Sequence, residues 1–291
     1  MPKKSYLFIL MAAALWGCLG VFLNLLTAAG LTSMQSVAVR TGTATVLYFL
    51  YLWVTDREAL KIHPRDCGCF IGTGILSLVF FNWCYFNTIQ LSSLSVAAVL
   101  LYTSPAFVML LSALLFHEPV TRHKLAALLL TFLGCTLVTG LLPLGGGGLS
   151  PKPLLFGLGA GFGYALYTIF SKFALAKYSP GTVSFYTFLF ATLAALPLSG
   201  LLGELSLLLS WRAVAGGLGM GIFCCILPYV FYTEGLRHAE AGKAAILATA
   251  EPFVAALLGI IFFHEVLTPF KLLGMAAILG SIVLLNSKVP Q

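Results

Sequence analysis

Long stretches of apolar residues, separated by short polar breaks, run along the whole chain. Each stretch approaches the length of about 20 residues that an α-helix needs to cross the hydrocarbon core of a bilayer. We therefore predict ten membrane-spanning helices, at residues 5 to 27, 33 to 54, 67 to 89, 94 to 116, 124 to 143, 153 to 175, 180 to 203, 211 to 233, 241 to 263 and 269 to 287. Because little chain is left over for a soluble domain, the pattern predicts an all-α membrane protein that is embedded in the lipid bilayer.

The composition supports this interpretation. Hydrophobic residues make up 60% of the chain and charged residues only 9%, against about a quarter charged in ordinary soluble domains. The mean hydropathy is +1.01. The apolar stretch at the N-terminus, preceded by Lys3 and Lys4, also has the pattern of a signal peptide. We expect it to be retained as the first helix, because the stretch has a counterpart later in the chain.

The basic residues between the predicted helices indicate the topology. If the first helix starts in the cytoplasm, cytoplasmic segments hold Lys3, Lys4, Arg57, Lys61, Arg65, Arg122, Lys124, Lys177, Arg237 and Lys288, and outside segments hold only Lys152, Arg212 and Lys271. Such an excess of Lys and Arg on the cytoplasmic side is the usual rule. The net charge of +7 then reflects topology and attraction to anionic lipid headgroups. We expect both termini in the cytoplasm of a multi-pass protein of the cell membrane, and no nucleic-acid partner.

Cysteine and histidine spacings argue against a metal or redox centre. The seven cysteines are odd in number and lie mostly within the apolar stretches, so no disulfide framework is expected. Cys67 and Cys69 have no second pair at zinc-like spacing. The sequence HEPVTRH, residues 117 to 123, misses the H-E-x-x-H spacing of zinc proteases. We predict no metal, no cofactor and no catalytic residue.

An internal repeat organises the chain. Residues 85 to 124 align with residues 232 to 271 at an offset of 147. The positions that match include Tyr85 and Tyr232, Pro105 and Pro252, His117-Glu118 and His264-Glu265, and Thr121 and Thr268. Each threonine is expected to cap the helix that follows it. We predict a first five-helix repeat at 1 to 143, a Gly- and Pro-rich linker at 144 to 152 and a second repeat at 153 to 291.

The number of helices in each repeat has a topological consequence. Because five is odd, the second copy enters the membrane from the opposite side. The chain is therefore predicted to hold inverted repeats, an arrangement typical of secondary transporters. Two nearly equivalent halves can open a central cavity to one side or the other with similar energies, which is alternating access.

Several short motifs carry a resemblance to a known family. They are AALWG (13 to 17), the T-S-P and A-E-P sequences that contain the two aligned prolines, and the two F-H-E-x-x-T segments. With this duplicated pattern, the chain resembles the EamA-type branch of the drug/metabolite transporter superfamily over essentially its whole length. The resemblance implies ten helices, cytoplasmic termini and a central cavity. Members move amino acids, other metabolites, nucleotide sugars and drugs, often outward.

Glu251 is the outstanding polar residue of the apolar stretches. It lies about ten residues into its predicted helix, which places it about 15 Å deep, near the middle of the membrane. An acidic side chain there costs about 2.5–3.5 kcal/mol and usually faces a cavity. We predict that Glu251 binds substrate and couples transport to protons, because burial favours its protonated form and a cationic ligand its charged form. The alternative is a protonated Glu251 bonded to a neighbouring helix.

The two repeats carry aligned prolines, and the proline of the second repeat directly follows Glu251. Pro105 and Pro252 each remove a backbone N–H and displace the carbonyl four residues earlier. Free carbonyls at membrane depth are tolerated where protein, water or ligand satisfies them. We predict both prolines as hinges beside the cavity, and a structural kink without ligand contact is the alternative.

Further candidate substrate-binding residues lie at similar depth. They are Trp16, Asn82, Trp83, Tyr85, Tyr102, Thr103, Tyr164, Tyr167, Tyr229 and Tyr232. Aromatic faces hold ammonium groups by cation–π attraction, so together with one carboxylate they suit an amine or a zwitterion. Helix packing and lipid contact are the alternatives for each aromatic. Arg40, about 10 Å deep, is a candidate for a substrate carboxylate or a gate, with snorkelling to the interface as its alternative.

These features predict a secondary transporter that moves a small polar metabolite, an amino acid or amine above all, across the cytoplasmic membrane. We expect efflux by alternating access, with proton antiport as the candidate coupling. A passive facilitator or channel-like pore is the alternative that keeps the same fold. A membrane enzyme is disfavoured, because the two His-Glu doublets fall on opposite sides of the predicted topology. The pattern defines no oligomeric state.

Overall fold

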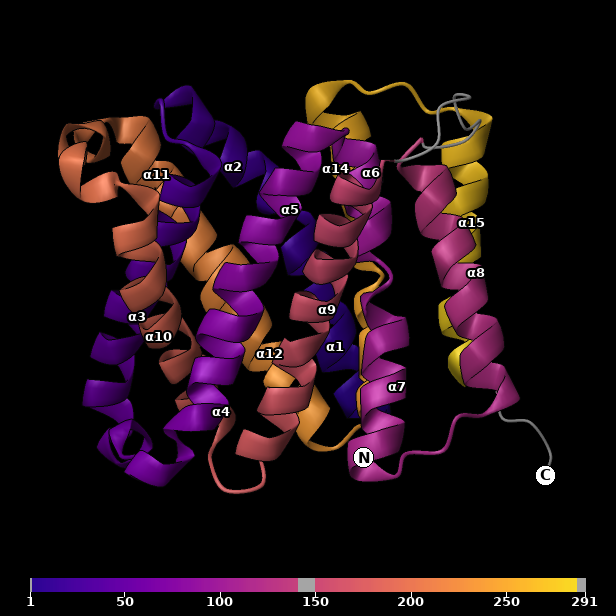
Figure 1. The fold of residues 1–291 in the computed structure, drawn as a ribbon, viewed down its shortest axis with the longest axis horizontal. Coiled ribbons are helices and arrows are strands. Elements are labelled where there is room, and N and C mark those ends of the chain that lie inside the picture. The colour runs from indigo at the N-terminus through magenta and orange to yellow at the C-terminus, as the bar shows by residue number, and fades with distance from the viewer. Residues whose placement is uncertain (1, 141–149, 287–291) are drawn as a thin grey trace.

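The protein is all-helical. The computed structural model describes residues 2–140 and 150–286, and these residues contain helices and no β-strand (Figure 1). The elements of the first part are α1 (Pro2–Gly17), α2 (Leu19–Ala28), α3 (Ser33–Thr55), η1 (Arg57–Leu60), η2 (Pro64–Asp66), α4 (Cys67–Ile71), η3 (Gly72–Val79), α5 (Phe80–Leu91), α6 (Leu94–Leu101), α7 (Ser104–Phe116) and α8 (Arg122–Val138). Those of the second part are α9 (Pro151–Ala174), α10 (Pro180–Ser199), η4 (Leu201–Gly203), η5 (Leu205–Leu209), α11 (Trp211–Gly219), η6 (Met220–Ile226), α12 (Leu227–Arg237), α13 (Ala241–Ala248), α14 (Glu251–Phe263) and α15 (Pro269–Asn286). Most of the predicted linker, residues 144 to 149, lies outside the described residues.

Joined across their short breaks, these elements form membrane-length helices. Eight stretches of the described chain are long and apolar enough to cross a bilayer, namely Lys4–Ala28, Ser33–Thr55, Pro64–Leu91, Leu94–Phe116, Pro151–Ala174, Pro180–Ser199, Trp211–Arg237 and Ala241–Phe262. The prediction of an all-α, multi-pass membrane protein is confirmed. The count of ten is not, because α8 has 17 residues and α15 offers a shorter apolar helix, Pro269–Leu285.

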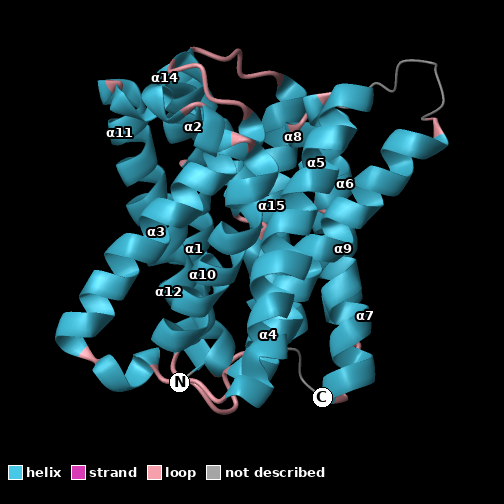
Figure 2. Cartoon of the chain, turned by 60° about the vertical axis from the view of Figure 1, so that its left-hand side comes forward, coloured by secondary structure: helices cyan, strands magenta, loops and turns pink. Residues whose placement is uncertain are grey.

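The helices run between two ends of a bundle, with the loops gathered at those ends (Figure 2). α1 and α9 begin at opposite ends (Figure 1). α8 and α15 pack closely against each other. A Cβ added at Gly134 would lie only 2.9 Å from the carbonyl oxygen of Gly274. The hydroxyl of Thr131 also donates to Ser281 across this pair, at 2.8 Å. The largest buried apolar cluster joins α1, α9, α12 and α13.

Irregular elements recur at close to the 147-residue offset. η3 and η6 are both π-helical segments. His117 (φ 54°) and His264 (φ 53°), the only described non-glycine residues with positive φ, end α7 and α14 in the same left-handed conformation. The capping predictions hold in both copies, since Thr121 accepts from the Lys124 N–H at 3.3 Å and Thr268 from the Lys271 N–H at 3.2 Å. The inverted relation of the halves and their boundaries stay predictions.

Both aligned prolines follow a helix break. Tyr102 and Thr103 separate α6 from α7, and Thr249 and Ala250 separate α13 from α14. Each proline then occupies the first turn of the second helix, where its missing N–H costs least. A threonine hydroxyl bonds a carbonyl at each break, Thr103 to Leu100 at 2.6 Å and Thr249 to Ile246 at 2.5 Å. The interruptions are observed, and hinge motion stays a prediction.

Candidate functional site

A cavity of two adjoining chambers lies between the helices at the level of the breaks. The wide chamber has a volume of about 150 Å³ and extends to Ser33 at the start of α3. The narrow chamber has a volume of about 30 Å³ and extends to Tyr232 and Ala245. The two chambers have six lining residues in common, which are Trp16, Phe81, Tyr102, Tyr164, Tyr229 and Glu251. Glu251 therefore lies at the junction of the chambers.

The break before α14 positions Glu251. This residue is the first of α14, so its carboxylate lies at the positive end of the helix dipole, which favours a negative charge. The hydroxyl of Tyr164, from α9, faces the carboxylate at 3.4 Å. Glu251 is half-buried, and its remaining surface faces the cavity. The site thus presents an acceptor for a cationic or hydrogen-bond-donating ligand.

Arg40 brings the opposite charge to the same cavity. It lies on α3, lines the wide chamber and is 7% exposed. One guanidinium nitrogen, Nη2, donates to the Asn82 side-chain oxygen at 3.2 Å, and the amide nitrogen of Asn82 is held by the Leu78 carbonyl at 2.7 Å. The Nε of Arg40 is buried and has no hydrogen-bond partner among the described residues. Such an unsatisfied charged donor is costly. Because the Arg40 side chain lines the wide chamber, its positive charge favours an anionic group there.

Aromatic rings line the two chambers beside Glu251. Trp16 packs edge-on against Tyr229, with ring centroids 5.5 Å apart, and against Tyr232 at 5.3 Å. Tyr167 contacts Tyr229 at 4.9 Å, and the Tyr232 hydroxyl shares a 2.8 Å hydrogen bond with Thr168. These rings offer π faces for an ammonium group beside a carboxylate.

The structure brings most of the predicted site residues together. The residues that line the cavity are Trp16, Arg40, Asn82, Tyr85, Tyr102, Tyr164, Tyr167, Tyr229, Tyr232 and Glu251. Two predicted residues lie outside its lining. Trp83 is 48% exposed, and its ring packs against that of Phe156 with centroids 5.3 Å apart. Its side chain lies on a different face of α5 from that of Asn82, which lines the cavity. The Thr103 hydroxyl is occupied by the Leu100 carbonyl.

Small hydroxyl residues complete the lining and were not predicted. Ser36 lines the wide chamber, and Ser77, Thr168 and Thr249 line the narrow one. Serine and threonine inside spanning helices commonly bond their own backbone, so their presence in an apolar stretch carries no signal. Ser104 also lines the narrow chamber, and its alignment with Glu251 is the one sequence feature that points to it.

Comparison with known proteins identifies the family. The model of the EamA-like transporter family matches the chain twice, at residues 3–140 and 151–287. A transporter of Archaeoglobus fulgidus is 32% identical over 260 residues, covering 86% of this chain and 90% of that protein. The threonine/homoserine exporter RhtA of Escherichia coli K12 is 29% identical over 274 residues, covering 92% and 86%.

A solved structure supports the fold independently. One crystal structure of a protein matches with a TM-score of 0.81 at 18% identity, covering 98% of this chain and 96% of that one. At this identity the likeness concerns the fold alone. The two family matches together span nearly the whole chain. The chain therefore belongs to the EamA-like transporter family, and it is a multi-pass membrane transporter of small molecules rather than an enzyme.

Proposed function

We propose that the protein is a secondary transporter that exports a small zwitterion, an amino acid above all, in exchange for protons. The observation that carries this proposal is that Arg40 and Glu251, which can bear opposite charges, line the same chamber. A substrate with a carboxylate and an ammonium group satisfies both charges, whereas an amine leaves Arg40 unsatisfied. The exporter RhtA, a relative at 29% identity, carries threonine and homoserine by its name, which agrees with this substrate class and with efflux.

Alternating access between inverted repeats is the proposed mechanism. Its support is the double match of the family model, the recurrence of π-segments and helix breaks near the 147-residue offset and the opposite starting ends of α1 and α9 (Figure 1). The repeats are proposed at residues 1 to 143 and 153 to 291. The excess of basic residues supports a cytoplasmic location for the starting end of α1 and for both termini.

Glu251 is the proposed coupling residue. Burial favours its protonated form, and the ammonium group of a substrate favours its charged form. Proton and substrate therefore compete for one side chain, which is the thermodynamic basis of antiport. Pro105 and Pro252 are the proposed hinges, since each begins a helix that carries part of the cavity wall.

The test is transport in proteoliposomes with a matched set of substrates. Labelled L-threonine, 1-amino-2-propanol and 3-hydroxybutyrate differ by loss of the carboxylate or the ammonium group, and further labelled amino acids extend the panel. Wild type should accumulate a zwitterion in response to a pH gradient and should not accumulate either truncated analogue. Glu251→Gln should abolish the response to the gradient while some exchange remains. Trp83→Phe, outside the cavity lining, is the control and should behave as wild type.

Two other outcomes identify the alternatives. Saturable exchange that responds neither to pH nor to Glu251→Gln would indicate a passive facilitator in which Glu251 has a structural role. Uptake that does not saturate and shows no counterflow would indicate a channel-like pore.

A further inference from the structure

The same motif turns the chain at opposite ends of the bundle. We define the first corner as residues 117–121, between α7 and α8, and the second corner as residues 264–268, between α14 and α15. Each corner opens with a left-handed histidine, continues with a glutamate and ends with a capping threonine. At an offset of 147, Glu118 corresponds to Glu265. The two corners are therefore equal in local geometry and can be compared contact by contact.

The first corner is fastened to the start of α13. The two carboxylate oxygens of Glu118 accept from the backbone N–H groups of Ala241, at 2.7 Å, and Gly242, at 3.1 Å. This contact satisfies two of the N–H groups that a helix start leaves free and places a negative charge at the positive end of the dipole. Ala241 is fully buried. α13 is thus held at its first turn by a residue of the other half of the chain.

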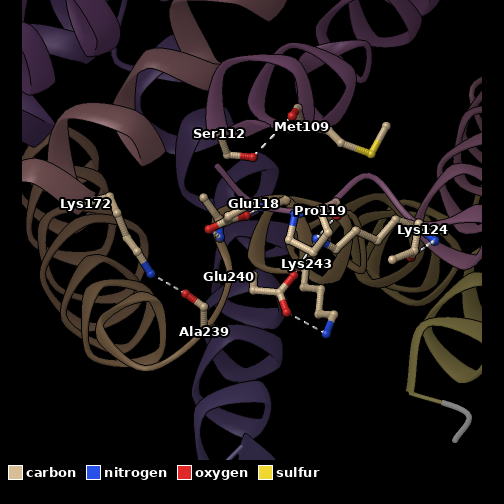
Figure 3. A network of polar contacts seen from close by, with 12 residues as sticks. Met109, Ser112, Glu118, Pro119, Lys124, Lys172, Ala239, Glu240 and Lys243 are labelled. Atoms are coloured by element: carbon tan, nitrogen blue, oxygen red, sulfur yellow. Dashed lines mark hydrogen bonds and ion pairs between the residues drawn. The ribbon is translucent and has the colours of Figure 1, made fainter. Parts of the chain in front are cut away.

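Ion pairs surround this contact (Figure 3). Lys124 donates to the Pro119 carbonyl at 2.7 Å and pairs with Glu240, the residue before α13. Glu240 also pairs with Lys243 at 2.9 Å. Lys172, from α9, donates to the carbonyl of Ala239. These contacts join α7, α8, α9 and α13 at the end of the bundle where α1 begins.

The second corner makes no such contact in the described chain. Glu265 pairs instead with Lys271 of its own α15, at 2.7 Å, and its side chain is 50% exposed. The 147-residue offset makes Leu94 and Ser95, at the start of α6, the counterparts of Ala241 and Gly242. Leu94 is 62% exposed, and the start of α6 is capped by its own Ser93 through the Val96 N–H at 3.2 Å. One corner is fastened and the other is open.

The cavity has the same asymmetry. α13 forms a wall of the narrow chamber through Ala245 and Ala248, and α6 reaches the wide chamber through Leu101. The volume is about 30 Å³ beside the fastened helix and about 150 Å³ beside the unfastened one. The chamber that is lined by the fastened helix is therefore the smaller of the two.

We infer that Glu118 and Glu265 are alternating latches that set the access state of the transporter. With Glu118 bound to the start of α13, the cavity is closed at the end where α1 begins. In the opposite access state Glu265 leaves Lys271 and binds the backbone N–H groups of Leu94 and Ser95, while Glu118 releases α13. This inference rests on the proposed alternating access. The glutamates act as positioning residues and do not touch the substrate.

The test uses equal substitutions with opposite expected effects. Ser33→Cys reports on the wide chamber and Ala245→Cys on the narrow one, each in a full-length background without the seven native cysteines. A water-soluble maleimide is the probe, and the ratio of the two modification rates measures the balance of access states. Glu118→Gln should raise modification at position 245 relative to position 33 by at least about tenfold, since the interaction lost is a charge-assisted one. Glu265→Gln should move the ratio the other way.

Controls separate the latch from general destabilisation and from the proposed function. Glu234→Gln removes an acid at the same end, whose ion-pair partner in the described part of the chain is His238 at 3.9 Å, and it should leave the ratio unchanged. A shift in the same direction for both latch variants, or no shift in either, would overturn the latch. Wild-type counterflow is measured in parallel. If counterflow is absent while the ratios move oppositely, the latch stands as a conformational switch and the proposed transport cycle fails.

Discussion

The two broken helices, α6–α7 and α13–α14, share a scaffold and differ in charge. Each break is two residues long, each second helix has 13 residues with proline in its first turn, and each ends at a left-handed histidine. The first residue after the break is Ser104 in one copy and Glu251 in the other. The comparison teaches that the repeated fold supplies the broken helix, whereas the charge at the break comes from a single unrepeated side chain.

The largest expected effect comes from moving the acid between the copies. Glu251→Ser should reduce proton-driven transport by at least about a hundredfold, a loss of about 2.7 kcal/mol that suits a charged hydrogen bond. Adding Ser104→Glu should not restore transport, because Ser104 lines only the narrow chamber and not the chamber that holds Arg40. Initial rates in proteoliposomes measure both. Recovery in the double variant would show that the two breaks are functionally interchangeable.

A second prediction concerns Arg40, which brings a positive charge to the chamber that Glu251 also lines. Arg40→Gln keeps a hydrogen-bond donor and removes the positive charge, so it should weaken binding of a zwitterion by about ten- to a hundredfold. Binding of the matching amine should change little or improve. Competition against a labelled substrate measures both affinities. Equal losses for zwitterion and amine would contradict a carboxylate-binding role for Arg40.

A third prediction addresses the close approaches that hold the breaks in place. A Cβ at Gly161 would lie 2.8 Å from the Leu100 carbonyl oxygen at the first break, and a Cβ at Gly17 would lie 2.7 Å from Val254 Cβ on α14. Gly161→Ala and Gly17→Ala should each destabilise the protein by about 1–3 kcal/mol through overpacking. Thermal unfolding in detergent measures the loss. Gly20→Ala, where an added Cβ would meet no other part of the described chain within 4 Å, is the matched control and should unfold at or above the wild-type temperature.

The smallest expected effect is on how stability depends on pH. It concerns Glu240, the residue directly before α13, whose counterpart before α6 is the uncharged Ser93. Burial alone raises the pKa of the Glu240 carboxyl, but hydrogen bonds from Lys124 and Lys243 more than offset it, so this pKa lies below its ordinary value of 4.5. The stabilisation is therefore present above about pH 4.5 and is lost as pH falls through the lower, folded-state pKa. Because Glu240 is partly exposed, we expect a contribution under about 1 kcal/mol.

Glu240→Gln tests this sign. Wild type should lose this part of its thermal stability on acidification below pH 4.5, and the variant should lack it at every pH. A difference between the two proteins that grows as pH falls would contradict the assignment.

Periodicity and membrane cost explain what could be predicted from the sequence. Apolar stretches of bilayer length gave the helices, and an acid in mid-membrane pointed to the cavity because few environments tolerate one. Arg40 and Asn82 could each be predicted as a site residue, but their hydrogen bond could not. They lie on α3 and α5, and only the tertiary packing of these two helices brings them together. Trp83 and Asn82 are neighbours in sequence, and only the rotation of α5 determines which faces the cavity. The contact between Glu118 and the start of α13 could not be predicted for the same reason, because the two lie more than a hundred residues apart in the sequence.

The fixed positive charge of Arg40 has an electrical consequence for the proposed cycle. With Glu251 ionised and a zwitterion bound, the charges in the cavity sum to zero, so the loaded carrier changes access state without moving net charge. With Glu251 protonated and the cavity empty, Arg40 leaves one positive charge. The proton that returns in each round of export carries one elementary charge inward, worth about 2.3 kcal/mol per 100 mV, and Arg40 determines that this charge moves in the step without substrate. A membrane potential that is negative inside drives efflux together with the proton gradient, and a cell that loses either still retains part of the driving force.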